Sequence, residues 1–343
     1  MAETTVGTKG EPSPQIILHG GDLDAARAAF PGAPEPWIDL STGINPWPYP
    51  LPPLAAEDWT RLPGRGAEEG LRHAAAGFYG APSADHVAAA PGSQAIIQLL
   101  PRLRRPGTGA VLGPTYAEHA QAWALAGHRV RTVTRVEDLE AADVAVVVNP
   151  NNPDGRILPA DVLTALAAHR HAAGGWLVVD EAFAEVTPEA SIAAHAGQPG
   201  LVVVRSFGKF FGLAGVRLGF VLAAPDTAAA VRAAVGPWAV AGPALTIGRA
   251  ALSDAVWAGQ ARARLAAAAA RLDSLLLKAA GLRVVGGTSL FRLVEDDRAP
   301  EFYEKLGRGG LLVRRFADHP ARLRFGLPPD SQSERRLHEA LME

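Results

Sequence analysis

The sequence predicts an α/β protein with a three-layer αβα large domain, whose sheet is mostly parallel, followed by a smaller α+β domain. A chain of 343 residues is long for a single hydrophobic core. Its short apolar runs are continuous rather than alternating, which is typical of strands buried on both faces of a parallel sheet. We expect residues 1–45 to be a tail and an arm joining the small domain, 46–250 the large domain, and 251–343 the small C-terminal domain.

The N-terminal part carries few signals of regular structure. Met1–Gln15 is polar, which predicts a mobile tail without the apolar segment of a secretory signal. Ile38–Leu54 is dense in proline, which predicts an extended arm and no regular element. Ala228–Ile247 is apolar, but a charge and two prolines interrupt it, so we expect a buried helix and turn there. The protein is therefore expected to be cytoplasmic, with no membrane partner.

The middle of the chain alternates helical patterns with apolar runs. Ala95–Leu103 and Ala117–Ala126 have helical spacing, and Pro159–Ala173 has proline at a plausible first helical position with Gly174-Gly175 after its end. The predicted strands of the large domain are Ala110–Leu112, Val144–Val148, Trp176–Val179, Leu201–Val204 and Leu218–Leu222.

The C-terminal part begins with a long Ala/Leu/Arg helix, Ala258–Ala280, which is predicted to bridge to the small domain. Three short strands and a closing helix are predicted after it: Leu290–Val294, Leu311–Arg315, Leu323–Phe325 and Ser333–Met342.

Composition narrows the possible functions. The formal net charge is −2, which gives no reason to expect a nucleic-acid partner. The chain has no cysteine, which excludes disulfides, thiolate chemistry and Cys-ligated metals, and we expect no metal cofactor. An anionic ligand must therefore be met by local positive groups.

Lys209 is the first candidate for chemistry. It follows the strand Leu201–Val204 and is flanked by Phe207, Phe210 and Phe211. Aromatic neighbours would remove water from the ammonium and so favour the nucleophilic amine. A loop lysine with its head in water is the plainer alternative.

Polar residues also follow two other predicted strands. Asp180 ends the run Trp176–Val179, at the strand end where open α/β sheets place ligand-binding groups. A pyridoxal phosphate (PLP) ring needs such a carboxylate at its nitrogen, although an aspartate there could instead cap a helix. Asn149–Gly155 follows the strand Val144–Val148, and it is either a plain turn or the source of an amide donor to the PLP ring oxygen.

A third set of residues suits a phosphate group. Gly92, Ser93 and Gln94 lead into a helix, where free N–H groups bind anions, although Ser93 could be a simple helix cap. Ser206 precedes the lysine by three residues and Arg217 follows it, and both could close around a dianion. Each fragment alone is weak, but together they supply every group that PLP requires.

These stretches, in this order, resemble the fold-type I PLP-dependent transferases, specifically the group of histidinol-phosphate aminotransferases and threonine-phosphate decarboxylases. The matching motifs are Asn149–Gly155, Asp180–Phe183 and Ser206–Gly219, and the likeness runs from about His19 to the end. It implies that Lys209 binds the cofactor covalently. The other implied cofactor-binding residues are Gly92, Ser93, Gln94, Tyr116 on the ring face, Asn152 at the ring oxygen, Asp180, Ser206 and Arg217.

The resemblance also implies a substrate site. Arg324 matches the arginine that grips the substrate carboxylate as a bidentate fork, although a strand arginine could also form a surface ion pair. Arg314 matches the position that meets a substrate phosphate. His19, Gly43 and Asn45 are further candidates, and His19 could equally be structural.

The N-terminal segments decide the expected subgroup. His19–Asp22 and Asp39–Pro46 are similar to threonine-phosphate decarboxylases of cobalamin biosynthesis, which implies decarboxylation of L-threonine O-3-phosphate. An aminotransferase acting on histidinol phosphate remains the alternative, and a catalytically idle partner in a cobalamin-synthesis complex is a third. The resemblance implies a homodimer.

Two positions depart from the family pattern. Leu62 stands where relatives carry a tyrosine that reaches the cofactor phosphate of the neighbouring subunit, so that contact is missing and PLP affinity could be lower. Phe183 stands where many aminotransferases carry tyrosine, which leaves Asn152 as the main donor to the ring oxygen.

Overall fold

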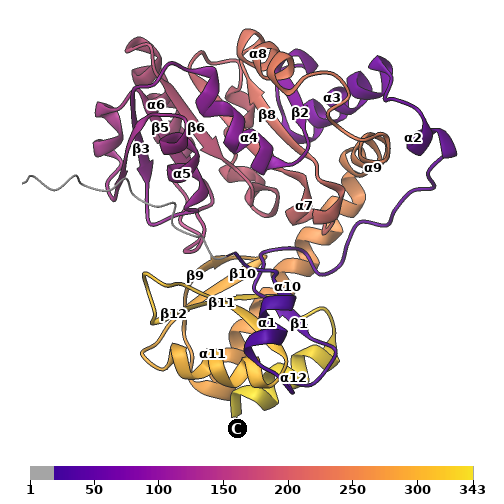
Figure 1. Ribbon diagram of the computed structural model, residues 1–343, viewed down its shortest axis with the longest axis vertical. Coiled ribbons are helices and arrows are strands. Elements are labelled where there is room, and N and C mark those ends of the chain that lie inside the picture. The colour runs from indigo at the N-terminus through magenta and orange to yellow at the C-terminus, as the bar shows by residue number, and fades with distance from the viewer. Residues whose placement is uncertain (1–18, 343) are drawn as a thin grey trace, which may run out of the picture.

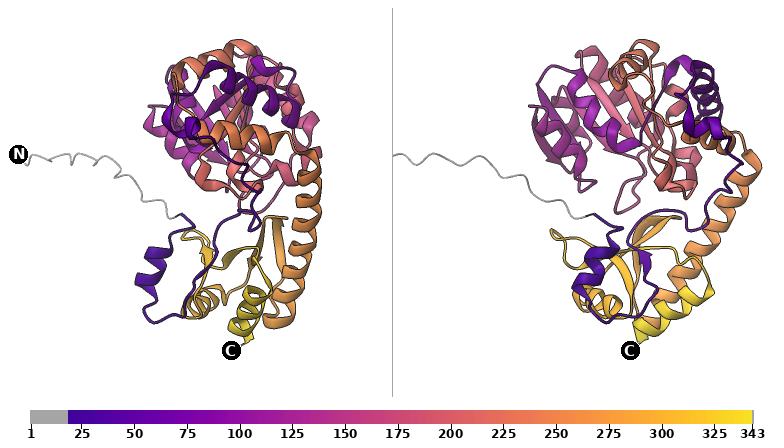
Figure 2. Two further views of the ribbon diagram at one scale, coloured as in Figure 1. Left: turned by 90° about the vertical axis from the view of Figure 1, so that its right-hand side faces the viewer. Right: turned by 45° about the vertical axis from the view of Figure 1, so that its right-hand side comes forward.

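The computed structural model describes residues 19–342, so the predicted tail Met1–Gln15 lies outside the described residues. The chain forms two sheets, each with its own helices, and the long helix α10 (Ala255–Ala280) runs along one side of both (Figures 1 and 2). This arrangement confirms the predicted α/β fold with a large three-layer part and a smaller α+β part.

The large sheet has seven strands in the order β2-β8-β7-β6-β5-β3-β4. Strand β8 is antiparallel to both neighbours, and the other pairs are parallel. The strands are β2 (Val87–Ala90), β3 (Thr108–Leu112), β4 (Arg129–Val133), β5 (Val144–Val148), β6 (Trp176–Asp180), β7 (Leu201–Ser206) and β8 (Gly219–Ala223).

Helices cover both faces of this sheet, which explains the continuous apolar runs. Val179 and Val203 pack into one core with α3, α6, α9 and α10, whereas Val178 and Val202 pack into a second core with α4, α5 and α8. The helices are α2 (Ala56–Thr60), α3 (Arg65–Tyr79), α4 (Ser93–Leu99), α5 (Glu118–Leu125), α6 (Ala160–Ala172), α7 (Phe207–Phe210), α8 (Pro225–Val235) and α9 (Gly242–Leu252).

The small sheet has five strands in the order β1-β11-β12-β10-β9. Strand β1 comes from the N-terminal arm and pairs in parallel with β11, while the other pairs are antiparallel. Its elements are α1 (Leu23–Ala29), β1 (Ile38–Leu40), β9 (Val284–Thr288), β10 (Phe291–Glu295), α11 (Ala299–Arg308), β11 (Leu311–Arg315), β12 (Arg322–Gly326) and α12 (Ser331–Met342).

Two local predictions are wrong. Ile38–Leu54 does contain a regular element, because Ile38–Leu40 forms a strand that pairs with Leu311–Val313. Pro159 lies at the N-cap of α6 in extended conformation and not in its first turn. Among the described residues, no helix is both long and apolar enough to cross a membrane.

Candidate active site

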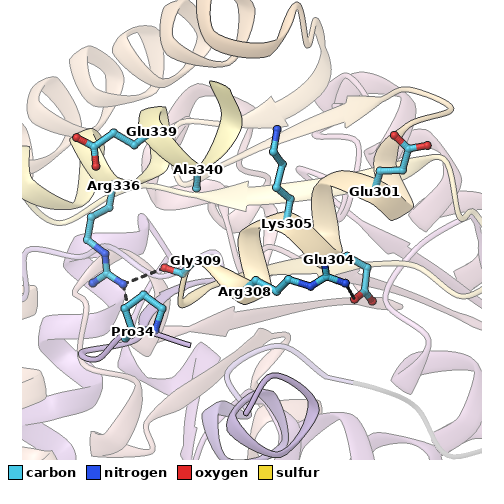
Figure 3. A pocket seen from close by; sticks show the side chains of 9 residues that line it. All are labelled: Pro34, Glu301, Glu304, Lys305, Arg308, Gly309, Arg336, Glu339 and Ala340. Atoms are coloured by element: carbon cyan, nitrogen blue, oxygen red, sulfur yellow. Dashed lines mark hydrogen bonds and ion pairs between the residues drawn. The ribbon is translucent and has the colours of Figure 1, made fainter. Parts of the chain in front are cut away.

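The predicted cofactor residues meet at the carboxyl ends of three neighbouring parallel strands. Asp180 ends β6, Ser206 ends β7, and Asn149 directly follows β5. The register places Val148 beside Asp180, and the backbone N–H of Asn149 donates to the Asp180 carbonyl at 2.8 Å. Open α/β sheets bind their ligands at this edge. A surface cavity of about 780 Å³ lies elsewhere, between α11, α12 and Pro34 (Figure 3).

Lys209 lies in the short helix α7, directly after β7. Burial, together with the positive charges of Arg324 and Arg217, lowers the pKa of its amine to about 8, against the opposing effect of Asp180. The nucleophilic character predicted for this lysine therefore has a physical basis.

The aromatic surroundings of Lys209 differ from the sequence prediction. Phe207, Phe210 and Phe211 are fully buried, and Phe211 stacks on both Phe207 and Trp257. These rings form the core beneath α7, because successive helical residues point in different directions. The Lys209 amine instead lies 5.8 Å from the ring centre of Phe183.

Asp180 is buried and held by two contacts. Its Oδ1 accepts a hydrogen bond from the Ala182 N–H at 3.0 Å, and its Oδ2 lies 2.8 Å from Nε2 of buried His119. His119 therefore orients the carboxylate. Sequence reasoning missed His119, since a histidine inside a helix gives no local signal of a contact to a strand 61 residues away.

The three asparagines after β5 have different surroundings. The Asn149 amide donates to the carbonyls of Leu158 and Ala190, and the buried Asn151 amide donates to Pro114 O and to Asp154 Oδ1. Asn152 alone reaches the small domain, where its Oδ1 accepts a hydrogen bond from Arg324. Two asparagines thus fix the loop, and the third is presented to the site.

The residues predicted to hold a phosphate come together. Gly219 pairs with Ser206 in the large sheet. It also packs so closely against the start of α4 that an added Cβ would lie 2.5 Å from the Ser93 backbone nitrogen. A Cβ on Gly92 would lie 2.7 Å from Nη2 of Arg217. The cap of α4 is Gly92, and Ser93 makes no capping bond, so the reading of Ser93 as a simple cap is wrong. The start of α4, the end of β7 and the Arg217 guanidinium therefore lie close together.

A hydrogen-bonded chain joins the N-terminal segment to this cradle. His19 Nε2 lies 3.0 Å from Glu118 Oε1, and Gln94 Nε2 donates to Glu118 Oε2 at 2.8 Å. The Tyr116 hydroxyl donates to Gln94 Oε1 at 3.2 Å. Burial and, after it, the charge of Glu118 raise the pKa of Tyr116 to about 12, so this tyrosine stays protonated. Sequence reasoning did not single out Glu118.

The two predicted substrate arginines lie side by side. Arg324 on β12 pairs in register with Arg314 on β11. The Arg324 guanidinium is buried and donates to Asn152 Oδ1 and, at 2.7 Å, to the Ser41 carbonyl, while its Nε has no partner in the structure. Burial and the neighbouring Arg314 lower the pKa of Arg324 to about 10. The alternative reading of Arg324 as a surface ion-pair residue does not fit this burial.

The N-terminal arm crosses between the domains beside the lysine. A Cβ on Gly43 would lie 2.9 Å from the rings of both Phe183 and Phe291, so only glycine fits there. Asn45 is buried, its side chain donates to the Phe210 carbonyl at 2.9 Å, and its backbone N–H donates to the Lys209 carbonyl at 2.9 Å. Asn45 thus ties the arm to α7, and its amide is engaged within the chain.

A buried charged cluster underlies the strand ends. Arg205, adjacent to Ser206, donates to Glu181, adjacent to Asp180, and its Nε lies 3.5 Å from Glu185 Oε1. Burial raises the pKa of Glu185 to about 7 despite Arg205. The cluster links the two strands that carry Asp180 and Ser206.

Comparison with known proteins places the chain in a family. The family model for class I and II aminotransferases matches residues 49–341. The chain belongs to the class I and II aminotransferase family. It is 46% identical to the threonine-phosphate decarboxylase of Pseudomonas aeruginosa over 95% of this chain and 98% of that one. A Sinorhizobium protein of the same name is also 46% identical, over 95% of this chain and 97% of its own.

Solved structures show the same fold. The histidinol-phosphate aminotransferase of Sinorhizobium meliloti, in complex with pyridoxal 5′-phosphate, has a TM-score of 0.79 at 20% identity and covers 96% of this chain and 95% of its own.

The class I and II aminotransferase site in this chain fits PLP on structural grounds. It offers an amine of lowered pKa at Lys209 and a carboxylate oriented by His119 at Asp180. It also brings the start of α4 close to Arg217 and to β8, an approach that a larger residue at Gly92 or Gly219 would prevent. An aldehyde, a ring nitrogen and a phosphate are the groups that such a donor set complements.

Proposed function

We propose that this chain is a PLP-dependent lyase that decarboxylates L-threonine O-3-phosphate to (R)-1-amino-2-propanol O-2-phosphate, a step of cobalamin biosynthesis. The observation that carries the proposal is the pair Arg314 and Arg324, which face each other on neighbouring strands of the small sheet. Two adjacent guanidiniums suit a substrate with two anionic groups, because each anion relieves the repulsion between them. The 46% identity to two threonine-phosphate decarboxylases supports the same substrate.

The roles of the cofactor-binding residues are part of this proposal. Lys209 would bind PLP through Nζ, Asp180 would meet the ring nitrogen, Asn152 the ring oxygen and Tyr116 the ring face. The phosphate would be held by the residues Gly92, Ser93, Gln94, Ser206 and Arg217. When bound, PLP withdraws electrons from the α-carbon of the amino acid.

In this proposal the arginines bind the substrate and the lysine transfers a proton. Arg324 grips the substrate carboxylate, and Arg314, with His19 beside Tyr116, meets the substrate phosphate. The bond from the α-carbon to the carboxylate carbon breaks, CO₂ leaves, and the electron pair stays on the α-carbon side. Lys209 Nζ returns a proton to the α-carbon. A pKa of about 8 suits this task, since the amine can both hold and release a proton near neutrality.

The test compares Arg314 with the arginine next to it. Arg315 lies on the same strand, points to the other face and contacts the Tyr303 ring, so Arg315→Gln is the matched control for Arg314→Gln. The unchanged protein should release CO₂ from L-threonine O-3-phosphate without a keto acid. Arg314→Gln should lower kcat/KM by about 100-fold, the loss of a charged bidentate contact, and Arg315→Gln should not.

Other outcomes assign the chain differently. Absence of CO₂ release, with amine transfer from histidinol phosphate to a keto acid, would make it an aminotransferase. Inactivity in both assays, with PLP bound, would favour the idle partner. Equal losses in both arginine variants would remove Arg314 from the phosphate site.

We further propose that two copies pair as a homodimer. Trp59, Leu62 and Trp238 expose 69%, 69% and 57% of their surface. They lie in one region, because Thr246 of α9 donates to Asp58 of α2 at 2.9 Å and Trp238 precedes α9. Large apolar side chains gathered on a surface mark an interface. Light scattering after size exclusion should give twice the chain mass.

A further inference from the structure

Glycines join the loop after β5 to the edge strand of the small domain. The loop extends from the large domain to β9 (Figure 1), where Gly287 N–H donates to the Asp154 carbonyl at 2.8 Å. A Cβ on Gly155 would lie 2.0 Å from Gly287 O, and one on Gly286 would lie 2.3 Å from Asp154 O. The backbones touch with no side chain between them. We call the residues Asp154, Gly155, Gly286 and Gly287 the glycine clasp.

Gly286 is unusual because its own backbone does not require glycine. Its φ lies outside the left-handed region, and it sits inside a strand, where glycine is unfavourable. Close approach of the loop is the feature that excludes a side chain. The clasp is therefore a specific backbone contact between the two domains, which glycine at this position makes possible.

The clasp is linked to two residues of the proposed site. On the small domain, Gly286 pairs with Leu293, and Leu293 pairs with Arg324, so the clasp and the arginine lie in one row across the sheet. On the large domain, Asn151 donates to Asp154 Oδ1 and to Pro114 O, so the loop is braced on both sides of Asn152. The hydrogen bond from Arg324 to Asn152 then joins the small-domain side of this linkage to the large-domain side.

We propose that the glycine clasp positions Asn152 and Arg324 for the reaction, so that both reach their working places only when the clasp joins the domains. The proposal rests on the proposed function, which assigns these side chains to the PLP ring oxygen and the substrate carboxylate. Gly286 and Gly287 act through other residues and are positioning residues. Opening the clasp would withdraw the amide and the guanidinium together.

The first test replaces Gly286 with alanine, and Gly259→Ala on α10, where nothing lies within 4 Å of a Cβ, is the matched control. Gly286→Ala should speed hydrogen exchange of the Gly287 amide at least tenfold. KM for L-threonine O-3-phosphate should rise about tenfold with kcat changed less than about threefold, because substrate must first drive closure. Gly259→Ala should change neither quantity. Faster exchange with an unchanged KM would overturn the proposal.

A second readout needs no turnover. In the PLP-loaded protein, the pH midpoint of the visible absorbance should rise by about one unit in Gly286→Ala, since a hydrogen bond to the ring oxygen is lost. In an Asn152→Ala background the same substitution should add almost nothing, because the two act together. Additive shifts would overturn the proposal. This readout stands even if L-threonine O-3-phosphate is not a substrate.

Reciprocity gives a test for the case in which Gly286→Ala fails to fold. If the clasp and the Arg324–Asn152 bond support each other, then Arg324→Gln must loosen the clasp by the same free energy. Exchange of the Gly287 amide in the PLP-loaded protein should then be at least about threefold faster in Arg324→Gln than in Arg322→Gln, a control at the start of the same strand whose side chain pairs with Glu295. Equal exchange in the two variants would overturn the proposal.

Discussion

Replacing Lys209 by methionine should stabilise the cofactor-free protein at neutral pH. The amine has a pKa of about 8 in the folded chain against 10.5 as the ordinary value, because burial and two arginines disfavour its charge. At about 1.4 kcal/mol per unit, the charged lysine destabilises the fold by about 3 kcal/mol below pH 8. Methionine keeps the length of the side chain and carries no charge.

The sign follows from the proton balance. Between pH 8 and 10.5 the unfolded chain holds a proton on Lys209 that the folded chain has lost, so the stability of the unchanged protein rises with pH across this window. Lys209→Met should remove that rise and gain about 3 kcal/mol at pH 7, a gain that fades as the pH approaches 10.5.

Urea unfolding of cofactor-free protein from pH 7 to 10 measures both effects. Lys278→Met, which removes an exposed lysine near the end of α10, is the control and should leave the pH dependence intact. Two results would refute the argument that burial disfavours the charged amine. One is a Lys209→Met variant that is less stable at pH 7, and the other is a variant whose free energy of unfolding keeps the same slope between pH 8 and 10.

Three further predictions concern single side chains. His119→Asn should weaken PLP binding about tenfold in equilibrium dialysis, because Asp180 loses a buried charged hydrogen bond; unchanged binding would remove its orienting role. Glu185 has a folded pKa of about 7 against 4.5, so stability should fall as pH rises from 4.5 to 7, and Glu185→Gln should flatten that fall in urea titrations; a persisting slope would contradict it. Leu62→Tyr should slow PLP loss if the proposed dimer forms, while Leu51→Tyr should not.

The strands found from sequence are those with a strong local signal. Val144–Val148 is five residues of β-branched and small apolar type, and the structure has the same bounds. Val87–Ala90 was missed because three alanines carry no strand preference, and it is a strand through packing against α3 and α8. Arg129–Val133 was missed because it is an exposed edge whose arginines resemble a loop.

The residues of the proposed site could be found from sequence where they follow a strand end. Lys209, Asp180 and Ser206 each stand directly at or after such an end, which local sequence reveals. His119 and Glu118 reach the site from a helix, through contacts set only by tertiary packing. Gly286 was also not foreseen, since a glycine in a weak strand resembles a turn until the loop that touches it is known.

The positive charges of the site couple the binding of anionic ligands to the stability of the fold. Burial lowers the pKa of both Arg324 and Lys209, and the charge of Arg314 adds to the effect on Arg324 as the charge of Arg324 does on Lys209, so three cations act on one another in the site. Each cation is less favourable because of the next, and this strain is present whenever the site holds no anion. The proposed cofactor would bring a phosphate dianion, and the proposed substrate a carboxylate and a second phosphate. Binding that relieves the strain stabilises the fold by the same free energy. Because the first anion removes part of the repulsion that the second would relieve, PLP and an inert dianion should raise the unfolding midpoint by less together than the sum of their separate effects.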